Sequence, residues 1–180
     1  MEIIASKWSQ SLKTLFIGNS WPSNTTYKCL IFKSLTALHE MRTSKLTVWR
    51  MENVENIDGA VRCLAMSWPK LRCLRLPLDR TSLISLSTLR IIAENCPDLR
   101  DLQLDISLDT STIPPFDTSK SLRHKLEDLT LWRAHPSDSV TLEYQIQVAQ
   151  YLDFIFPYLK LKLVLPKDKI WSGIHHLVKL

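Results

Sequence analysis

Glycine is scarce in this chain, which has only 3 glycines in 180 residues. Loops that bind phosphate through their backbone need closely spaced glycines, because only glycine combines close backbone approach with positive φ angles. This composition argues against a glycine-rich phosphate-binding loop.

Long apolar runs and paired cysteines are also missing. No window approaches the roughly 18 apolar residues of a membrane span, and the opening MEIIASKWSQSL lacks the apolar core of a signal peptide. Cys29, Cys63, Cys73 and Cys96 form no C-x-x-C pair of the kind that nucleates many zinc sites. These absences predict an intracellular protein, cytoplasmic or nuclear, with reduced thiols, no membrane attachment and no cofactor.

The charge is positive but dispersed. A formal net charge of +5 suits an acidic partner, yet charge of this size also keeps ordinary soluble domains apart. Only the lysines at 160, 162, 167 and 169 cluster, and aromatic residues do not alternate with them as base-stacking platforms would. The charge pattern therefore disfavours a nucleic-acid partner.

The chain contains an internal repeat. WPKLRCLRL begins at Trp68 and CPDLRDLQL at Cys96, and each carries the L-x-x-L-x-L pattern typical of a leucine-rich repeat strand. Related but weaker copies occur elsewhere. We predict one domain over residues 1–180, with strand units that begin near Leu12, Leu46, Leu71, Leu99 and Leu126 and a variant terminal strand near Leu159.

Helical periodicity fills most of the gaps between these strands. Apolar residues recur at helical spacing over 27–41, 57–68, 86–96 and 142–156, with Asn56 or Asp58 as a cap for the second helix and Ser139 for the last. The exception is Asp105 to Lys125, where Pro114–Pro115 excludes a long helix and predicts a loop, with one turn near 119–124. We expect an α/β leucine-rich repeat solenoid, a short horseshoe with parallel strands on its concave face and helices or loops on its convex face.

The WPxLRxLxL and CPxLRxLxL junctions, and above all STLRIIAENCPDLRDLQL, resemble the leucine-rich repeat region of fungal F-box proteins. In that family an F-box helix bundle docks on the adaptor of a cullin-RING ubiquitin ligase, and the repeats hold the protein to be ubiquitinated. The resemblance implies a protein-binding scaffold and a ubiquitination substrate as partner. The chain lacks the Leu-Pro opening that an F-box requires before its first repeat, so the resemblance does not support adaptor binding. A repeat-only scaffold unrelated to ubiquitination is the alternative.

If the leucines point inward, the residues between them form the concave face. Arg and Trp are enriched among interface hot spots, so Arg50, Arg75 and Trp132 are the first candidates for partner contact. The full predicted set of partner-binding residues is Arg50, Arg75, Asp101, Gln103, Asp128, Thr130 and Trp132. The competing interpretation is that Arg75 only pairs with Asp101 or Gln103 across the strands.

An enzyme is the other class to weigh. Cys73 with His124 or His135 would supply a nucleophile and a base, but their spacing does not bring them together and no third group orients them. An acidic cluster of Asp101, Asp105 and Asp128 would be the candidate for a cation. Neither pattern is specific, and we predict no catalytic or metal-binding residue.

Overall fold

The computed structural model describes residues 13–17, 44–48, 56–76, 83–108, 113–117, 122–135, 140–163 and 169–178. Its centre is a six-stranded sheet in which neighbouring strands are parallel and follow one another in sequence order. The strands are β1 (Thr14–Ile17), β2 (Lys45–Val48), β3 (Cys73–Arg75), β4 (Asp101–Ser107), β5 (Asp128–His135) and β6 (Lys160–Leu163). The predicted α/β class is confirmed.

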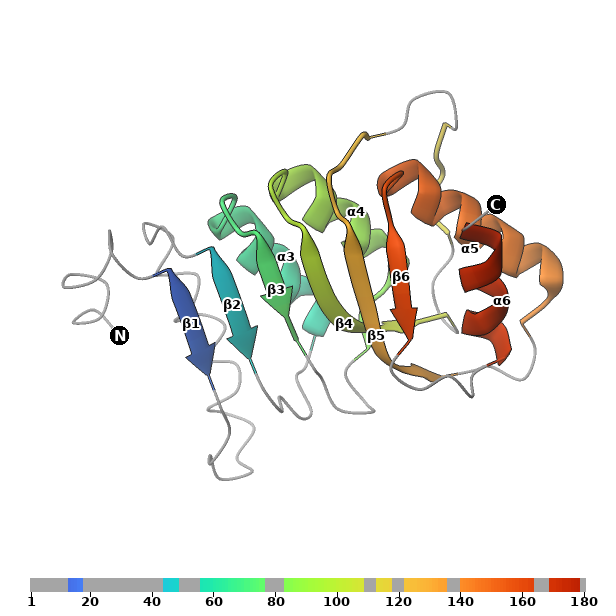
Figure 1. The fold of residues 1–180 in the computed structure, drawn as a ribbon, viewed down its shortest axis with the longest axis horizontal. Coiled ribbons are helices and arrows are strands. Elements are labelled where there is room, and N and C mark those ends of the chain that lie inside the picture. The colour runs from blue at the N-terminus through green and yellow to red at the C-terminus, as the bar shows by residue number, and fades with distance from the viewer. Residues whose placement is uncertain are drawn as a thin grey trace.

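The described helices lie on one side of the sheet. They are α3 (Ile57–Ser67), α4 (Leu86–Asn95), α5 (Leu142–Ile155) and α6 (Lys169–Val178). In Figure 1 the sheet faces the viewer, α3, α4 and α5 lie behind it, and α6 lies beside α5 near β6. Within the described part of the chain, the core therefore lies between one face of the sheet and this row of helices.

A row of leucines crosses the sheet at one register position. Its members are Leu15, Leu46, Leu74, Leu102, Leu129 and Leu161. From Leu46 onward each is 4% exposed or less. These side chains are removed from water because the neighbouring units and the helices cover them, and burial of each full leucine contributes about 1.5–3 kcal/mol.

Strand β2 corrects the predicted alignment. The predicted units place Leu46 in the position of Leu71 and leave Val48 on the open side of the sheet. The register instead aligns Leu46 with Leu74, and Val48 is 1% exposed in the core. The segment KLTVWRM carries apolar residues that fit both alignments, and an odd shift in alignment moves every strand side chain to the opposite face.

Three helix-to-strand connections repeat one local structure. Trp68, Cys96 and Phe156 end α3, α4 and α5, and each donates its backbone N–H to the carbonyl four residues earlier. A proline follows each of them and stops the helix, because it has no N–H and disfavours helical geometry in the residue before it. The amides of Leu71, Leu99 and Leu159 then donate to the carbonyls of those three residues at 3.0 to 3.1 Å. The shared sequence motif, Pro followed two residues later by Leu, thus encodes a shared turn.

The predicted buried faces of α3 and α4 are confirmed. These residues are Ile57, Val61, Leu64, Trp68, Leu86, Leu89, Ala93 and Cys96, each 7% exposed or less. The prediction is wrong at the start of α5, where Leu142 is 66% and Ile146 is 38% exposed and the buried residues begin at Val148. Periodicity identifies a face of a helix but not how far along the helix its neighbours reach.

The two proposed caps of α3 serve two different helices. Asn56, with φ of 52°, caps α3 by accepting a hydrogen bond from the Gly59 amide at 3.0 Å. Asp58 accepts from the Ser85 amide at 2.9 Å and from the Thr88 hydroxyl at 2.6 Å, so it caps α4. Adjacent helices are therefore joined by a polar link as well as by apolar packing.

The segment between β4 and β5 is shorter than predicted. Asp105 to Ser107 belong to β4, and Ile84 bridges to Ile106 beside them. Residues 113–117 and 122–127 contain no helix, as Pro114–Pro115 predicts, and the turn expected near 119–124 does not appear in residues 122–124. Phe116 from this segment packs against aromatic rings of α5, with ring centroids 5.3 Å apart. This helix-free segment therefore packs against α5.

Thr141 is the N-cap of α5, its hydroxyl accepting from the Tyr144 amide at 3.2 Å. Several predicted features lie outside the described residues: the strand start at Leu12, the helix over 27–41, the cap Ser139, and Trp49 and Met51, which the predicted unit starting at Leu46 places at inward positions. None of the helices in the described ranges is both long and apolar enough to cross a membrane.

Candidate functional site

The face of the sheet opposite the helices is the candidate site, and we call it the open face. One row of its residues, the Cys73 row, contains Thr14, Lys45, Cys73, Asp101, Asp128 and Lys160. A second, the Arg75 row, contains Phe16, Thr47, Arg75, Gln103, Thr130 and Lys162. No helix of the described ranges lies over these rows (Figure 1).

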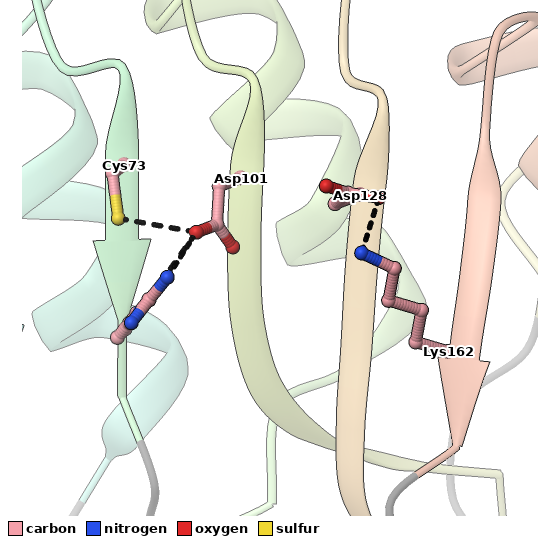
Figure 2. A network of polar contacts seen from close by, with 5 residues as sticks. Cys73, Asp101, Asp128 and Lys162 are labelled. Atoms are coloured by element: carbon pink, nitrogen blue, oxygen red, sulfur yellow. Dashed lines mark hydrogen bonds and ion pairs between the residues drawn. The ribbon is translucent and has the colours of Figure 1, made fainter.

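Asp101 holds two side chains of the neighbouring strand β3. The Arg75 guanidinium donates to its Oδ2 from Nε at 3.2 Å and from Nη2 at 2.5 Å, and the Cys73 thiol donates to the same oxygen at 3.5 Å. Figure 2 shows the Cys73 thiol on β3 pointing toward the Asp101 carboxylate on β4. The pair between Arg75 and Asp101 across the strands, which the competing interpretation expects, is present.

A second charge pair joins β5 and β6. Lys162 Nζ lies 2.8 Å from Asp128 Oδ1, and the lysine side chain is 58% exposed (Figure 2). Exposed pairs of this kind contribute about 0–1 kcal/mol to stability, because water and salt screen them. Their larger effect is to hold long side chains in place and set a pattern of charge on the face.

The predicted contact residues differ in how much surface they present. Arg75 is 48% exposed in its side chain and Asp101 28%, whereas Gln103 is only 9% exposed as a residue. Thr130 is half-buried on β5. Trp132 belongs to β5, but its side chain lies outside the described part of the structure.

The shift of β2 changes the membership of the face. Thr47 lies beside Arg75 in the position predicted for Arg50, and Arg50 is outside the described residues. Lys45 lies beside Cys73, in the place predicted for Val48. Sequence reasoning missed Lys45 and Thr47 because no proline turn precedes β2 to fix its alignment. Asp105, a member of the predicted acidic cluster, is fully buried.

On the described part of the open face, Cys73, Asp101 and Asp128 are engaged in hydrogen bonds and ion pairs with side chains of the neighbouring strands. Burial and then the Asp101 carboxylate raise the pKa of Cys73, which disfavours the thiolate that a nucleophile needs. Of the three acidic residues considered for a cation, Asp101 and Asp128 are register partners, but each pairs with a basic side chain, Arg75 and Lys162 respectively, and Asp105 is buried. The described ranges hold no group of three or more His, Cys, Asp or Glu side chains arranged for a metal ion.

His124 performs a structural task instead. Its Nε2 donates to the Cys96 carbonyl at 2.8 Å, and its Nδ1 accepts from the Leu126 amide at 3.0 Å, which fixes the neutral ring with the proton on Nε2. The ring is 4% exposed and meets Phe156 edge-on, with centroids 5.3 Å apart. Burial lowers the pKa of His124, and both ring nitrogens are engaged by backbone groups, so this ring is not a base for Cys73.

Comparison of the sequence with protein-family models and with curated proteins finds no match.

Proposed function

We propose that the chain is a leucine-rich repeat solenoid that binds a partner protein on the open face of its sheet. The repeat architecture is supported by the leucine row, whose members recur every 27 or 28 residues from Leu46 to Leu129. It is supported further by the shared turn that follows α3, α4 and α5. Such units cannot bury their leucines alone, which is why they stack.

The observation that carries the binding function is the open face itself. All-parallel sheets are usually covered by helices on both sides. Here the described helices cover one side, and the other carries polar and charged side chains on every strand from β1 to β6. A surface of this breadth, without a metal cluster or an activated thiolate among the described residues, suits recognition of a protein better than catalysis on a small molecule.

The charge pairs support recognition of a specific partner. Arg75 is held by Asp101 and Lys162 by Asp128, so their side chains lose less conformational freedom when a partner binds. Arginine is also among the residues most often found at interface hot spots. We therefore propose Arg75 and Asp128 as contact residues, together with Thr130 of the Arg75 row.

The test compares two variants that remove the same charges from opposite sides of the molecule. R75A/D128A alters the open face, and R90A/E94A removes an exposed ion pair on the outside of α4. Each protein is expressed in its native cell, and its captured partners are quantified by mass spectrometry. We expect R75A/D128A to lose the specific partners and R90A/E94A to keep them, with circular dichroism unchanged in both. Retention of all partners by R75A/D128A would refute the proposal.

The resemblance to F-box proteins extends the proposal to ubiquitination. On this view the captured partners are ubiquitination substrates, and their ubiquitin-modified peptides decrease when the chain is removed from the cell. Unchanged ubiquitination of those partners would leave the second form of the proposal, a binding scaffold that serves another purpose.

A further inference from the structure

We propose that the β1–β3 part of the open face binds an acidic, extended segment of the partner protein. This inference rests on the proposed protein-binding function and specifies the chemistry of the partner. Four exposed basic residues carry it, which we call the basic strip: Lys45 in the Cys73 row of the open face, and Lys13, Lys70 and Arg72 at the adjoining edge of the sheet, just before β1 and β3.

The strand register brings the basic strip together. Lys45 donates its backbone N–H to the Lys13 carbonyl at 3.0 Å, and Arg72 donates to the Ser44 carbonyl at 2.8 Å. Lys45 is directly opposite Cys73 on β3, and Lys70 lies in the turn that leads into that strand. Since neighbouring strands are about 4.8 Å apart, the strip spans roughly 10 Å from β1 to β3.

Acidic side chains are absent from this part of the face, as far as the described residues extend. In the ranges 13–17, 44–48 and 56–76 the one acidic residue is Asp58, which lies on α3 and is engaged in capping α4. The acids of the face begin with Asp98 and Asp101, and Asp101 is already paired with Arg75. Within those ranges no carboxylate forms an ion pair with a member of the basic strip.

The position before each strand shows how the charge changes along the molecule. The residue directly before the first leucine of each repeat unit is Lys70 ahead of β3, Asp98 ahead of β4 and Lys125 ahead of β5. In the Cys73 row, Lys45 is followed by the uncharged Cys73, then by two acids and then by Lys160. The excess of positive charge is therefore specific to β1–β3 and is not a general feature of the sheet.

An acidic peptide fits this surface better than other ligands. Like charges gathered within a short span repel one another, and an anionic partner relieves this repulsion while its approach is steered by the field. Phe16, 63% exposed on β1 in the adjoining Arg75 row, offers a contact for an apolar side chain of the same peptide. Single-stranded nucleic acid usually requires several stacking aromatics, whereas Phe16 is the one exposed aromatic in the ranges 13–17, 44–48 and 56–76.

The experiment uses the full chain and three fluorescein-labelled probes. The first is a short peptide of glutamate and serine residues around a single phenylalanine, the second is the same peptide with lysine in place of glutamate, and the third is oligouridylate of matched charge. Binding is measured by fluorescence anisotropy at low salt and at about 0.3 M salt, where screening becomes strong. We expect the acidic peptide to bind more tightly than both other probes and to weaken as salt is added.

A matched pair of variants locates the site. K45E/K70E reverses two charges of the basic strip, and K125E/K160E makes the same reversals at the equivalent repeat positions of β5 and β6. We expect affinity for the acidic peptide to fall at least about tenfold in K45E/K70E and less than about twofold in K125E/K160E. If K45E/K70E does not fold by circular dichroism, K45Q/K70Q replaces it, with a loss of several-fold expected.

Three results would overturn the inference: equal loss in both variant pairs, equal binding of the lysine peptide, or tighter binding of oligouridylate. These results are separable from failure of the proposed function. If R75A/D128A loses its cellular partners while the acidic peptide does not bind, the open face binds a protein of different chemistry. If R75A/D128A keeps its partners while the acidic peptide binds through Lys45 and Lys70, the proposed contacts at Arg75 and Asp128 are wrong and the basic strip stands.

Discussion

Replacement of His124 tests how consecutive units of the fold are joined. The ring connects the Cys96 carbonyl at the end of α4 to the Leu126 amide before β5, and it packs against Phe156 after α5. His124→Ala removes both hydrogen bonds and leaves a cavity. An unsatisfied buried polar group costs about 1–3 kcal/mol, and lost packing adds to this, so we expect a loss of about 3–5 kcal/mol in the free energy of unfolding.

The same contact predicts a dependence on pH. Nδ1 accepts the Leu126 amide only when the ring is neutral, and the pKa of His124 is lowered from 6.5 in the folded protein. The unfolded chain therefore binds a proton more readily than the folded one. This part of the stability is complete above the unfolded pKa of 6.5 and is lost as pH falls toward the lower folded value. Between pH 7.5 and 5.5 the loss is at most about 1.4 kcal/mol.

The assay is urea unfolding at pH 7.5 and 5.5 for the natural protein, His124→Gln and His176→Gln. Glutamine offers a donor and an acceptor without titrating in this range, so His124→Gln should lose less stability on acidification than the natural protein. His176 is exposed, and His176→Gln serves as the matched control substitution. Equal pH dependence in His124→Gln and the natural protein would refute the role given to the neutral ring.

Three further perturbations probe the core, the cap and the thiols. Asp58→Ala should lower the free energy of unfolding by about 2 kcal/mol, because the first turn of α4 loses two hydrogen bonds; a change below about 0.5 kcal/mol in chemical unfolding would contradict this. Leu102→Ala, in the centre of the leucine row, should lower the free energy of unfolding by about 2–5 kcal/mol. Leu142→Ala, at a 66% exposed site, should lower it by less than about 0.5 kcal/mol. Similar losses in the two variants would be inconsistent with the packing. A thiol-reactive probe should label the exposed Cys63 rapidly and Cys96 slowly. Cys96 is fully buried, and burial raises its pKa to about 12. Fast labelling of Cys96 in the folded protein would contradict its place in the core.

Sequence reasoning succeeded where a local signal fixed the alignment. The Trp68-Pro and Cys96-Pro phrases state where a helix ends and where the next strand starts, so the rows through Leu74 and Leu102 were predictable. Before β2 no such phrase exists, and the apolar residues of KLTVWRM satisfy two alignments equally. Periodicity alone could not choose between them, and Thr47 was missed as a member of the face.

Contacts between units were less predictable than contacts within them. The sequence marks Asp58 as a helix cap, but its position favours a cap for its own helix α3, whereas in the structure it caps α4. His124 belongs to no repeat pattern, and its bond to Cys96 crosses 28 residues of sequence. The pair between Arg75 and Asp101 followed from the aligned strands, which is why it was foreseen as an alternative.

The open face is tested most directly through the register of β2, because this register places Lys45 on the open face and Val48 in the core. Lys45 is opposite the native Cys73, at a separation about as large as that between adjacent strands and within the range that a disulfide spans. Mild oxidation of Lys45→Cys, followed by peptide mapping, should yield a disulfide to Cys73, and Val48→Cys should yield none. A disulfide between Cys73 and a cysteine at position 48, with none from position 45, would contradict this register and the open face built on it.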